Sequence, residues 1–232
     1  MTDLKYITGD EFVNKILGGE RDFRNIRLQP GFDVHSHPKI TELRWYLSDS
    51  RGDLQNNPLD LSGSEFLNLQ ARNLCLSHVK ARDSYFGRSS FIYCGFESVD
   101  FKNADLRGSE LQRTRWFKAN LSDANFTDGN LTSAIFYKTN LRGAKLAGAK
   151  LTGANLFEGT DLYGADLVQA NLVEANLEAA QNLRCTHGLS SANFLKTRIN
   201  IADVGACKKA VDREYLVYEE GFWQRLKRLF EE

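Results

Sequence analysis

Two histidines separated by one residue, His35 and His37, are the first candidates for chemistry in this chain. A His-x-His pair on a strand places two imidazoles on one side, where they can bind a metal ion. The surrounding sequence offers no carboxylate or thiol at a spacing that would complete such a site. We therefore expect neither histidine to be a metal ligand, and the sequence predicts no metal site and no cofactor.

Cysteine and histidine also come together at Cys185 and His187, with Cys207 further along the chain. A site built from them would need the chain to fold back, so we interpret them as packed or solvated side chains. No two cysteines form a CxxC pair, which argues against a disulfide framework. The chain also lacks a glycine-rich phosphate loop, a GxSxG motif and a metalloprotease motif. The sequence therefore predicts no catalytic residues and no enzyme.

The charge composition bears on whether the partner is a nucleic acid or a nucleic-acid-binding protein. Lys and Arg number 30 and Asp and Glu number 30, so the formal net charge is zero. A nucleic-acid-binding protein usually has a basic excess, and a protein that imitates DNA has an acidic one. The first residues, MTDLKYITGDEFVNK, carry charges and no long apolar run, so we expect neither a signal peptide nor a transmembrane helix. We expect a cytoplasmic protein with reduced thiols.

A repeat of five residues organises the middle of the chain. Over residues 61–156 every fifth residue is apolar, at twenty positions without a break. The residue two before each of these centres is small or of modest size, and the one directly before is often Asn or Asp. Where the centre shrinks to Ala71 or Ala81, the residue two before grows to Leu69 or Val79. The interior volume is thereby conserved, as close packing requires.

A period of five fits neither an amphipathic helix nor an alternating strand. It fits a chain that turns a corner once per unit, so that four units make a square coil of 20 residues. Such coils stack about 4.8 Å apart. The centres and the small residues two before them fill the bore, and the other three positions face water. Asn, Asp and Gly suit the corners, where we expect Gly108, Gly143, Gly148 and Gly153.

The unit A(D/N)LxG, seen almost pure in AKLTG and TDLYG, resembles the pentapeptide-repeat family. The resemblance covers roughly residues 59–180 continuously. It implies an all-β solenoid, specifically a right-handed quadrilateral β-helix. Gly159 inserts one residue into the repeat, which resumes at Leu162, and a second break follows over AAQNLRCTHGLSS.

The ends of a solenoid need caps, because an open end exposes apolar bore and strand edges. We expect short α-helical caps at both ends. The predicted segments are an N-terminal helical cap and first partial coil (1–28, with Phe23 and Leu28 in the coil), an insertion or loop (29–58), the repeat β-helix (59–205, ending on Phe194, Ile199 and Val204) and a C-terminal amphipathic helix cap (206–232).

The N-terminal cap and the insertion carry more specific expectations. GDEFVNKIL, residues 9–17, predicts a short helix with Asp10 as its N-cap. In the insertion, ITELRWYLSD predicts a short helix or a strand. The aromatic residues Phe32, Trp45 and Tyr46 suggest that the insertion packs on another part of the molecule.

The C-terminal segment, residues 206–232, is amphipathic by its sequence. We expect it to cap the solenoid, with homodimerisation through this helix as the alternative. Contact with a membrane surface is disfavoured because Glu residues offset its Lys and Arg.

The coil register also predicts a binding surface. Residues 20 apart stack on one face, so Phe117, Tyr137 and Phe157 form an outward row, which we call the aromatic stripe. Ile135 lies beside it, and Lys118 and Lys138 border it. Exposed aromatic side chains bordered by charge are typical of a protein-binding patch. Two other interpretations stay open: coverage by the 29–58 insertion, and plain cross-strand stacking.

These observations predict a scaffold module that binds an unidentified protein partner, with no direct contact to nucleic acid or membrane. The family resemblance adds an alternative, since some pentapeptide-repeat proteins imitate DNA, bind DNA gyrase and protect it from quinolones. That role needs a strongly acidic face. Here acidic and basic residues balance, and Arg107, Arg113, Arg115 and Lys118 predict a local basic cluster.

Overall fold

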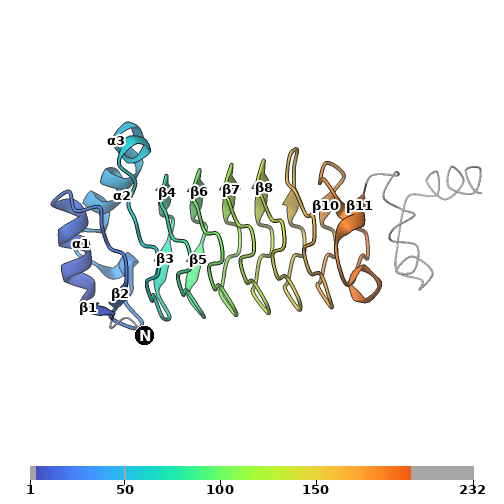
Figure 1. Ribbon diagram of the computed structural model, residues 1–232, viewed down its shortest axis with the longest axis horizontal. Helices are drawn as coiled ribbons and strands as arrows, with labels where there is room; N and C mark the ends of the chain where they lie inside the picture. The colour runs from blue at the N-terminus through green and yellow to red at the C-terminus, as the bar shows by residue number, and fades with distance from the viewer. Residues whose placement is uncertain (1–3, 50, 200–232) are drawn as a thin grey trace, which may run out of the picture.

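The structure, a computed structural model, describes residues 4–49 and 51–199. Figure 1 shows an elongated solenoid with helices gathered at its N-terminal end and coils stacked one behind another. The helices are α1 (Gly9–Leu17), α2 (Ile40–Asp49) and α3 (Arg51–Asn56), with 3-10 turns at Val34–Ser36, Leu183–Cys185 and Leu189–Ser191. The strands are β1 (Lys5–Ile7), β2 (Ile26–Leu28), β3 (Gln70–Arg72), β4 (Cys75–Ser77), β5 (Ser90–Ile92), β6 (Gly95–Glu97), β7 (Arg115–Phe117), β8 (Ile135–Tyr137), β9 (Asn155–Leu156), β10 (Asn176–Leu177) and β11 (Arg198–Ile199).

The strands stack in parallel, coil on coil. The longest sheet has the order β11-β10-β9-β8-β7-β6-β4, and within it Phe96 is in register with Trp116, and Trp116 with Phe136. Another face repeats the offset of 20 residues as a single bridge, for example between Asp100 and Asn120. The quadrilateral β-helix that the five-residue period predicts is therefore confirmed.

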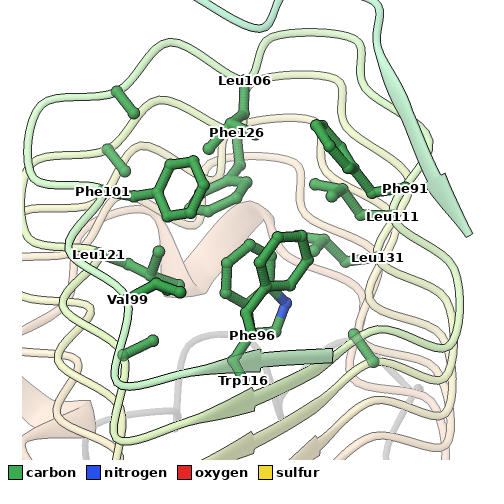
Figure 2. Close-up of a cluster of buried hydrophobic side chains, with 14 of the residues drawn as sticks. Phe91, Phe96, Val99, Phe101, Leu106, Leu111, Trp116, Leu121, Phe126 and Leu131 are labelled. Atoms are coloured by element: carbon green, nitrogen blue, oxygen red, sulfur yellow. The ribbon is translucent and has the colours of Figure 1, made fainter. Parts of the chain in front are cut away.

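The centres of the repeat fill the bore. Every centre from residue 61 to residue 156 is buried, and Figure 2 shows such side chains converging on the axis. The larger ones stack along the axis: ring centroids are 4.0 Å apart for Phe96 and Trp116 and 6.3 Å apart for Trp116 and Phe136. Ala71 and Ala81 are buried together with Leu69 and Val79, which confirms the exchange of volume predicted for these units.

Hydroxyl groups in the bore make a repeated hydrogen bond that the sequence pattern alone does not reveal. Ser109 Oγ donates to the carbonyl of Phe86 at 2.9 Å, and Thr139 Oγ1 donates to the carbonyl of Trp116 at 3.0 Å. Each bond links a small inward residue to the centre of the coil before it. A buried hydroxyl without a partner would be destabilising, and this bond explains how Ser and Thr replace Ala there.

The corners use left-handed backbone, as predicted. Gly143 and Gly148 have φ of 65° and 66°, and Asn and Asp residues adopt the same conformation at many other corners. Asn120 also stabilises its turn directly, since its Oδ1 accepts a hydrogen bond from the backbone N–H of Ser122 at 3.2 Å. Lys118 and Lys138, at the border of the aromatic stripe, have positive φ too.

The two breaks in the repeat enlarge single coils without ending the stack. After the extra residue at Gly159 the partner of Asn140 is Asp161, an offset of 21 residues. Across the second break β10 and β11 pair Asn176 with Arg198. Phe194 and Ile199 are buried, which confirms the last partial coil over the described residues, while Val204 lies outside them.

The N-terminal end is closed by α1, which packs against the first coils. Phe12 of this helix contacts Phe23 and Phe66 edge to face, with centroids 5.0 and 5.9 Å apart. The predicted helix is confirmed, but Asp10 as N-cap was wrong. Thr8 is the N-cap, and its Oγ1 accepts a hydrogen bond from the Glu11 N–H at 3.1 Å. Gly9 is the first helical residue, so the helix begins two residues earlier than an N-cap at Asp10 would allow.

The insertion at residues 29–58 is helical. The segment left open between helix and strand forms α2, whose Leu43 and Leu47 are buried, and Leu54 of α3 joins them. Of the aromatic residues expected to pack, Phe32 and Tyr46 do, but Trp45 is 67% exposed. The reason is helical spacing, since a residue two after Leu43 points away from the buried face. The predicted C-terminal cap, residues 206–232, lies outside the described residues.

Candidate protein-interaction surface

The aromatic stripe occupies the outward side of the longest sheet. Glu97, Phe117 and Tyr137 are in register in β6, β7 and β8, and Phe157 follows directly after β9, where its N–H donates to the carbonyl of Phe136 at 2.8 Å. The structure thus brings together the three aromatic residues that the register predicted.

The stripe is stacked and still exposed. The rings of Phe117 and Tyr137 are parallel within 3°, with centroids 5.1 Å apart. Phe117 is 37% and Phe157 39% exposed, whereas Tyr137, between them, is more buried than either. Ile135 lies beside the stripe in β8, half-exposed, and continues the apolar surface. Cross-strand stacking therefore exists, but it leaves ring surface open to a partner.

The insertion covers the same face at a different place. Figure 1 shows α2 and α3 beside β4, and Arg44 of α2 donates to the carbonyl of Arg72 at 3.1 Å. Ser77 of β4, in the same outward column two coils before Phe117, is only 2% exposed. The insertion thus covers this face only at coils that precede the stripe. Coverage of the stripe by residues 29–58 was therefore the wrong interpretation.

Three cations border the stripe. Lys118 Nζ lies 5.1 Å from the ring centroid of Phe117, and Lys138 Nζ lies 5.2 Å from that of Tyr137. Arg115 is exposed in β7 on the other side. Among the described residues none of the three makes an ion pair, whereas Arg107 pairs with Asp105 at 2.6 Å on another face.

The predicted basic cluster is only partly correct. Arg115 and Lys118 share the face of the stripe, but Arg107 lies on another face beside Asp105. Arg113 is at a corner, where its guanidinium lies 5.2 Å from the ring of Tyr93 and bonds the hydroxyl of that residue. Residues close in sequence separate because a chain that turns every five residues sends neighbouring units to different faces.

The two histidines of the insertion do not converge on one site. His35 is exposed, and its Nδ1 is 3.1 Å from Arg44 Nη2. His37 is buried, with Nε2 3.1 Å from Asp10 Oδ1 and Nδ1 accepting from the Lys39 N–H at 3.1 Å. Within residues 4–49 and 51–199 no group of three or more His, Cys, Asp and Glu side chains could hold a metal ion.

The cysteines divide into buried and exposed. Cys94 occupies a small inward position of the bore, and burial raises the pKa of its thiol to about 12. Cys75 and Cys185 are exposed and free, and Cys207 lies outside the described residues. The fold-back that would join Cys185 and His187 to Cys207 is therefore not described.

Charge is mixed on the faces. In one outward row Asp60, Lys80, Asp100, Asn120 and Asn140 follow one another from coil to coil. Arg82 pairs with Asp100 at 2.5 Å, so a carboxylate of this row is neutralised locally. Such a row differs from the continuous line of negative charge that an imitation of DNA needs. In the part of the chain that the structure describes, no helix is long and apolar enough to span a bilayer.

Fold and surface together define a β-solenoid that displays side chains in columns. Comparison with protein families gives the same result: the family model "Pentapeptide repeats" matches 8 copies over residues 73–108, 119–156 and 157–181. The matched residues of this chain therefore carry pentapeptide repeats. A search of curated proteins found no match.

Solved structures of the same family resemble this chain. A pentapeptide repeat protein from the Arabidopsis thaliana thylakoid lumen is 26% identical, with 48% of this chain matching 66% of that one at a TM-score of 0.35. HetL, involved in heterocyst differentiation regulation in Nostoc sp. strain PCC 7120, is 21% identical over 84% of this chain and 91% of its own, with a TM-score of 0.32. QnrB1, a plasmid-mediated fluoroquinolone resistance protein, is 15% identical over 86% and 94%, with a TM-score of 0.41.

Proposed function

We propose that this pentapeptide-repeat protein is a non-catalytic scaffold module that binds another protein through the aromatic stripe, Phe117, Tyr137 and Phe157, with Ile135 at its side. The observation that carries the proposal is the exposure of Phe117 and Phe157 on a sheet face whose N-terminal part is already covered. Aromatic side chains in the centre of a patch and charged ones at its border are what protein interfaces favour.

The rigid solenoid supports this role. Each stripe residue directly follows a buried bore residue, for example Phe117 after Trp116 and Tyr137 after Phe136. The stripe is thereby held in place before any partner arrives, so little conformational entropy is lost on binding. Exposed free thiols at Cys75 and Cys185 support the cytoplasm as the compartment, since exposed thiols persist in a reducing environment.

A triple variant tests the proposal: Phe117, Tyr137 and Phe157 each replaced by Ala. Wild type and variant would be immobilised, exposed to a lysate of the source organism, and the captured proteins compared. The matched control replaces Tyr93 and Tyr163 by Ala, two tyrosines that are each 49% exposed outside the stripe. We expect a specific partner with wild type and control and its loss with the stripe variant. Equal capture by all three folded proteins would contradict the proposal.

The alternative, a DNA-imitating modulator of DNA gyrase, gains no support from the described surface, because acidic, basic and neutral side chains are mixed in its outward rows. A supercoiling assay with purified gyrase separates the two roles. The scaffold proposal predicts no change in supercoiling on addition of the protein. Inhibition, or relief of inhibition by a quinolone, would favour the alternative.

A further inference from the structure

We infer that the partner segment bound by the aromatic stripe is an amphipathic helix with carboxylates along one edge of its apolar face. This inference rests on the proposed function and adds the chemistry of the partner. It starts from the cations at the border of the stripe, Arg115, Lys118 and Lys138.

The charge around the stripe is not balanced within the described part of the chain. Some arginines elsewhere on the solenoid have ion-pair partners, as in Arg142 with Asp161 at 3.0 Å and Arg198 with Glu178 at 3.0 Å. Arg115, Lys118 and Lys138 have no ion-pair partner among the described residues. Lys118 and Lys138 instead lie over the rings of Phe117 and Tyr137, so cations and rings face an incoming partner together.

Acidic residues of the same face lie at the ends of the stripe. Glu97 precedes Phe117 in the outward column, and Glu158 is exposed directly after Phe157. Neither lies between the two lysines. A partner with carboxylates along the edge that meets Lys118 and Lys138 is attracted at these two coils of the stripe, whereas a basic partner is repelled there.

Spacing decides the form of the segment. Successive stripe residues belong to successive coils, which stack about 4.8 Å apart. Side chains on one face of a helix recur at i, i+3 or i+4 and i+7, that is every 4.5–6 Å along its axis, given a rise of about 1.5 Å per residue. On an extended strand, side chains on one face recur about every 6.6 Å or more. This spacing exceeds that of the coils, so a strand that is aligned with the first ring no longer matches the third. A helix along the solenoid axis matches the three rings.

Single-stranded nucleic acid also combines stacking bases with charge, but the stripe fits it less well. Bases stack on free aromatic faces. Here the faces of Phe117 and Tyr137 are turned toward each other at 5.1 Å, and Lys118 and Lys138 lie over the rings. What remains open is ring edge and apolar surface, which suits aliphatic and aromatic side chains of a protein.

The test is a selection from a phage library of random 18-residue peptides against the full chain, followed by synthesis of the enriched peptides. Binding is measured by fluorescence anisotropy with wild type and with the Phe117/Tyr137/Phe157→Ala variant. We expect stripe-dependent peptides with Asp or Glu beside apolar residues at three- and four-residue spacing. Stripe-dependent peptides that are neutral or basic, or that alternate with a period of two, would overturn the inference and leave the proposed function standing. If no enriched peptide depends on the stripe, both fail.

Charge reversal sharpens the result. Lys118→Glu with Lys138→Glu should weaken an enriched acidic peptide about tenfold or more, since two attractive contacts become repulsive. The same peptide with Lys in place of its acidic residues should gain affinity for that variant. Lys145→Glu with Lys150→Glu, which makes the same charge change at exposed positions on other faces, should alter binding less than about twofold.

Binding of a fluorescent single-stranded dT oligonucleotide of 20 nucleotides is measured in the same way, to test nucleic acid as the ligand of the stripe. We expect no stripe-dependent binding of it. If it binds wild type and is lost with the triple variant, the surface is one for nucleic acid and the inference is overturned.

Discussion

The same strands carry two columns of aromatic residues, one inside the solenoid and one outside. In β7 and β8 the inward residues are Trp116 and Phe136 and the outward ones are Phe117 and Tyr137. Both columns stack: Trp116 and Phe136 are parallel within 5°, and Phe117 and Tyr137 within 3°. Burial is the difference, since Trp116 is 1% and Phe117 37% exposed. Stacking alone therefore does not separate a structural column from a binding one, whereas access to water does.

The largest expected effect comes from a charge placed in each column. Phe126→Asp puts a carboxylate at a fully buried position of the bore, so we expect a loss of more than about 4 kcal/mol and an unfolded protein. Far-UV circular dichroism and thermal melting would measure this. The counterpart Phe117→Asp should remain folded and lose only the partner. If both variants unfold, the outward column is also needed for folding, and the distinction between a structural inner column and a binding outer column is wrong.

Truncation gives the next largest difference. Trp116→Ala removes the largest bore side chain and should destabilise the protein by about 3–5 kcal/mol. Phe117→Ala loses one stacked contact at a partly exposed site and should cost at most about 1.5 kcal/mol. Urea unfolding of both variants, with wild type alongside, tests this pair. Equal losses would mean that the stripe is buried against something in solution.

A smaller effect is expected for the hydroxyl groups. Thr139→Val keeps the shape of the side chain but removes its bond to the Trp116 carbonyl inside the bore, for an expected loss of about 1 kcal/mol. Thr132→Val changes a hydroxyl that bonds the Asn130 side chain on the outside and should stay within about 0.5 kcal/mol. The same unfolding experiment compares the two. A larger loss of stability for Thr132→Val than for Thr139→Val would contradict the expectation that the hydroxyl group in the bore contributes more than the one on the outside.

The smallest effect on stability is expected from the thiols, whose reactivity compares a buried cysteine with exposed ones. At neutral pH we expect little change in stability. In a Cys207→Ser background, Cys75 and Cys185 should react rapidly with a thiol reagent, and Cys94 only on unfolding. Burial raises the pKa of Cys94 in the folded protein to about 12 from 9.0, so the contribution of this thiol to stability is complete below pH 9.0. It is lost as the pH rises toward about 12. Fast labelling of all three thiols in the native protein would contradict the buried position of Cys94.

Much of the fold followed from the period of the sequence. Every fifth residue had to be inside because only a chain that turns once per unit buries a five-residue repeat, and one exchange of volume, at Ala71 and Leu69, confirms the register. The position of the stripe followed from the same arithmetic. The N-cap of α1 did not, because Asp10 and Thr8 are both good caps by residue type and only backbone geometry chooses between them.

The sequence by itself determined which residues face the bore and which face water, and hence the order of the stripe. Tertiary structure alone decided that α2 and α3 lie beside β4 and leave Phe117 open. It also decided that Arg107 is paired, while Lys118 and Lys138 have no ion-pair partner among residues 4–49 and 51–199. The physical reason is that the repeat is local, with each unit constrained by its five residues and the coil beneath. The insertion has no period, so its place depends on contacts between residues far apart in the chain.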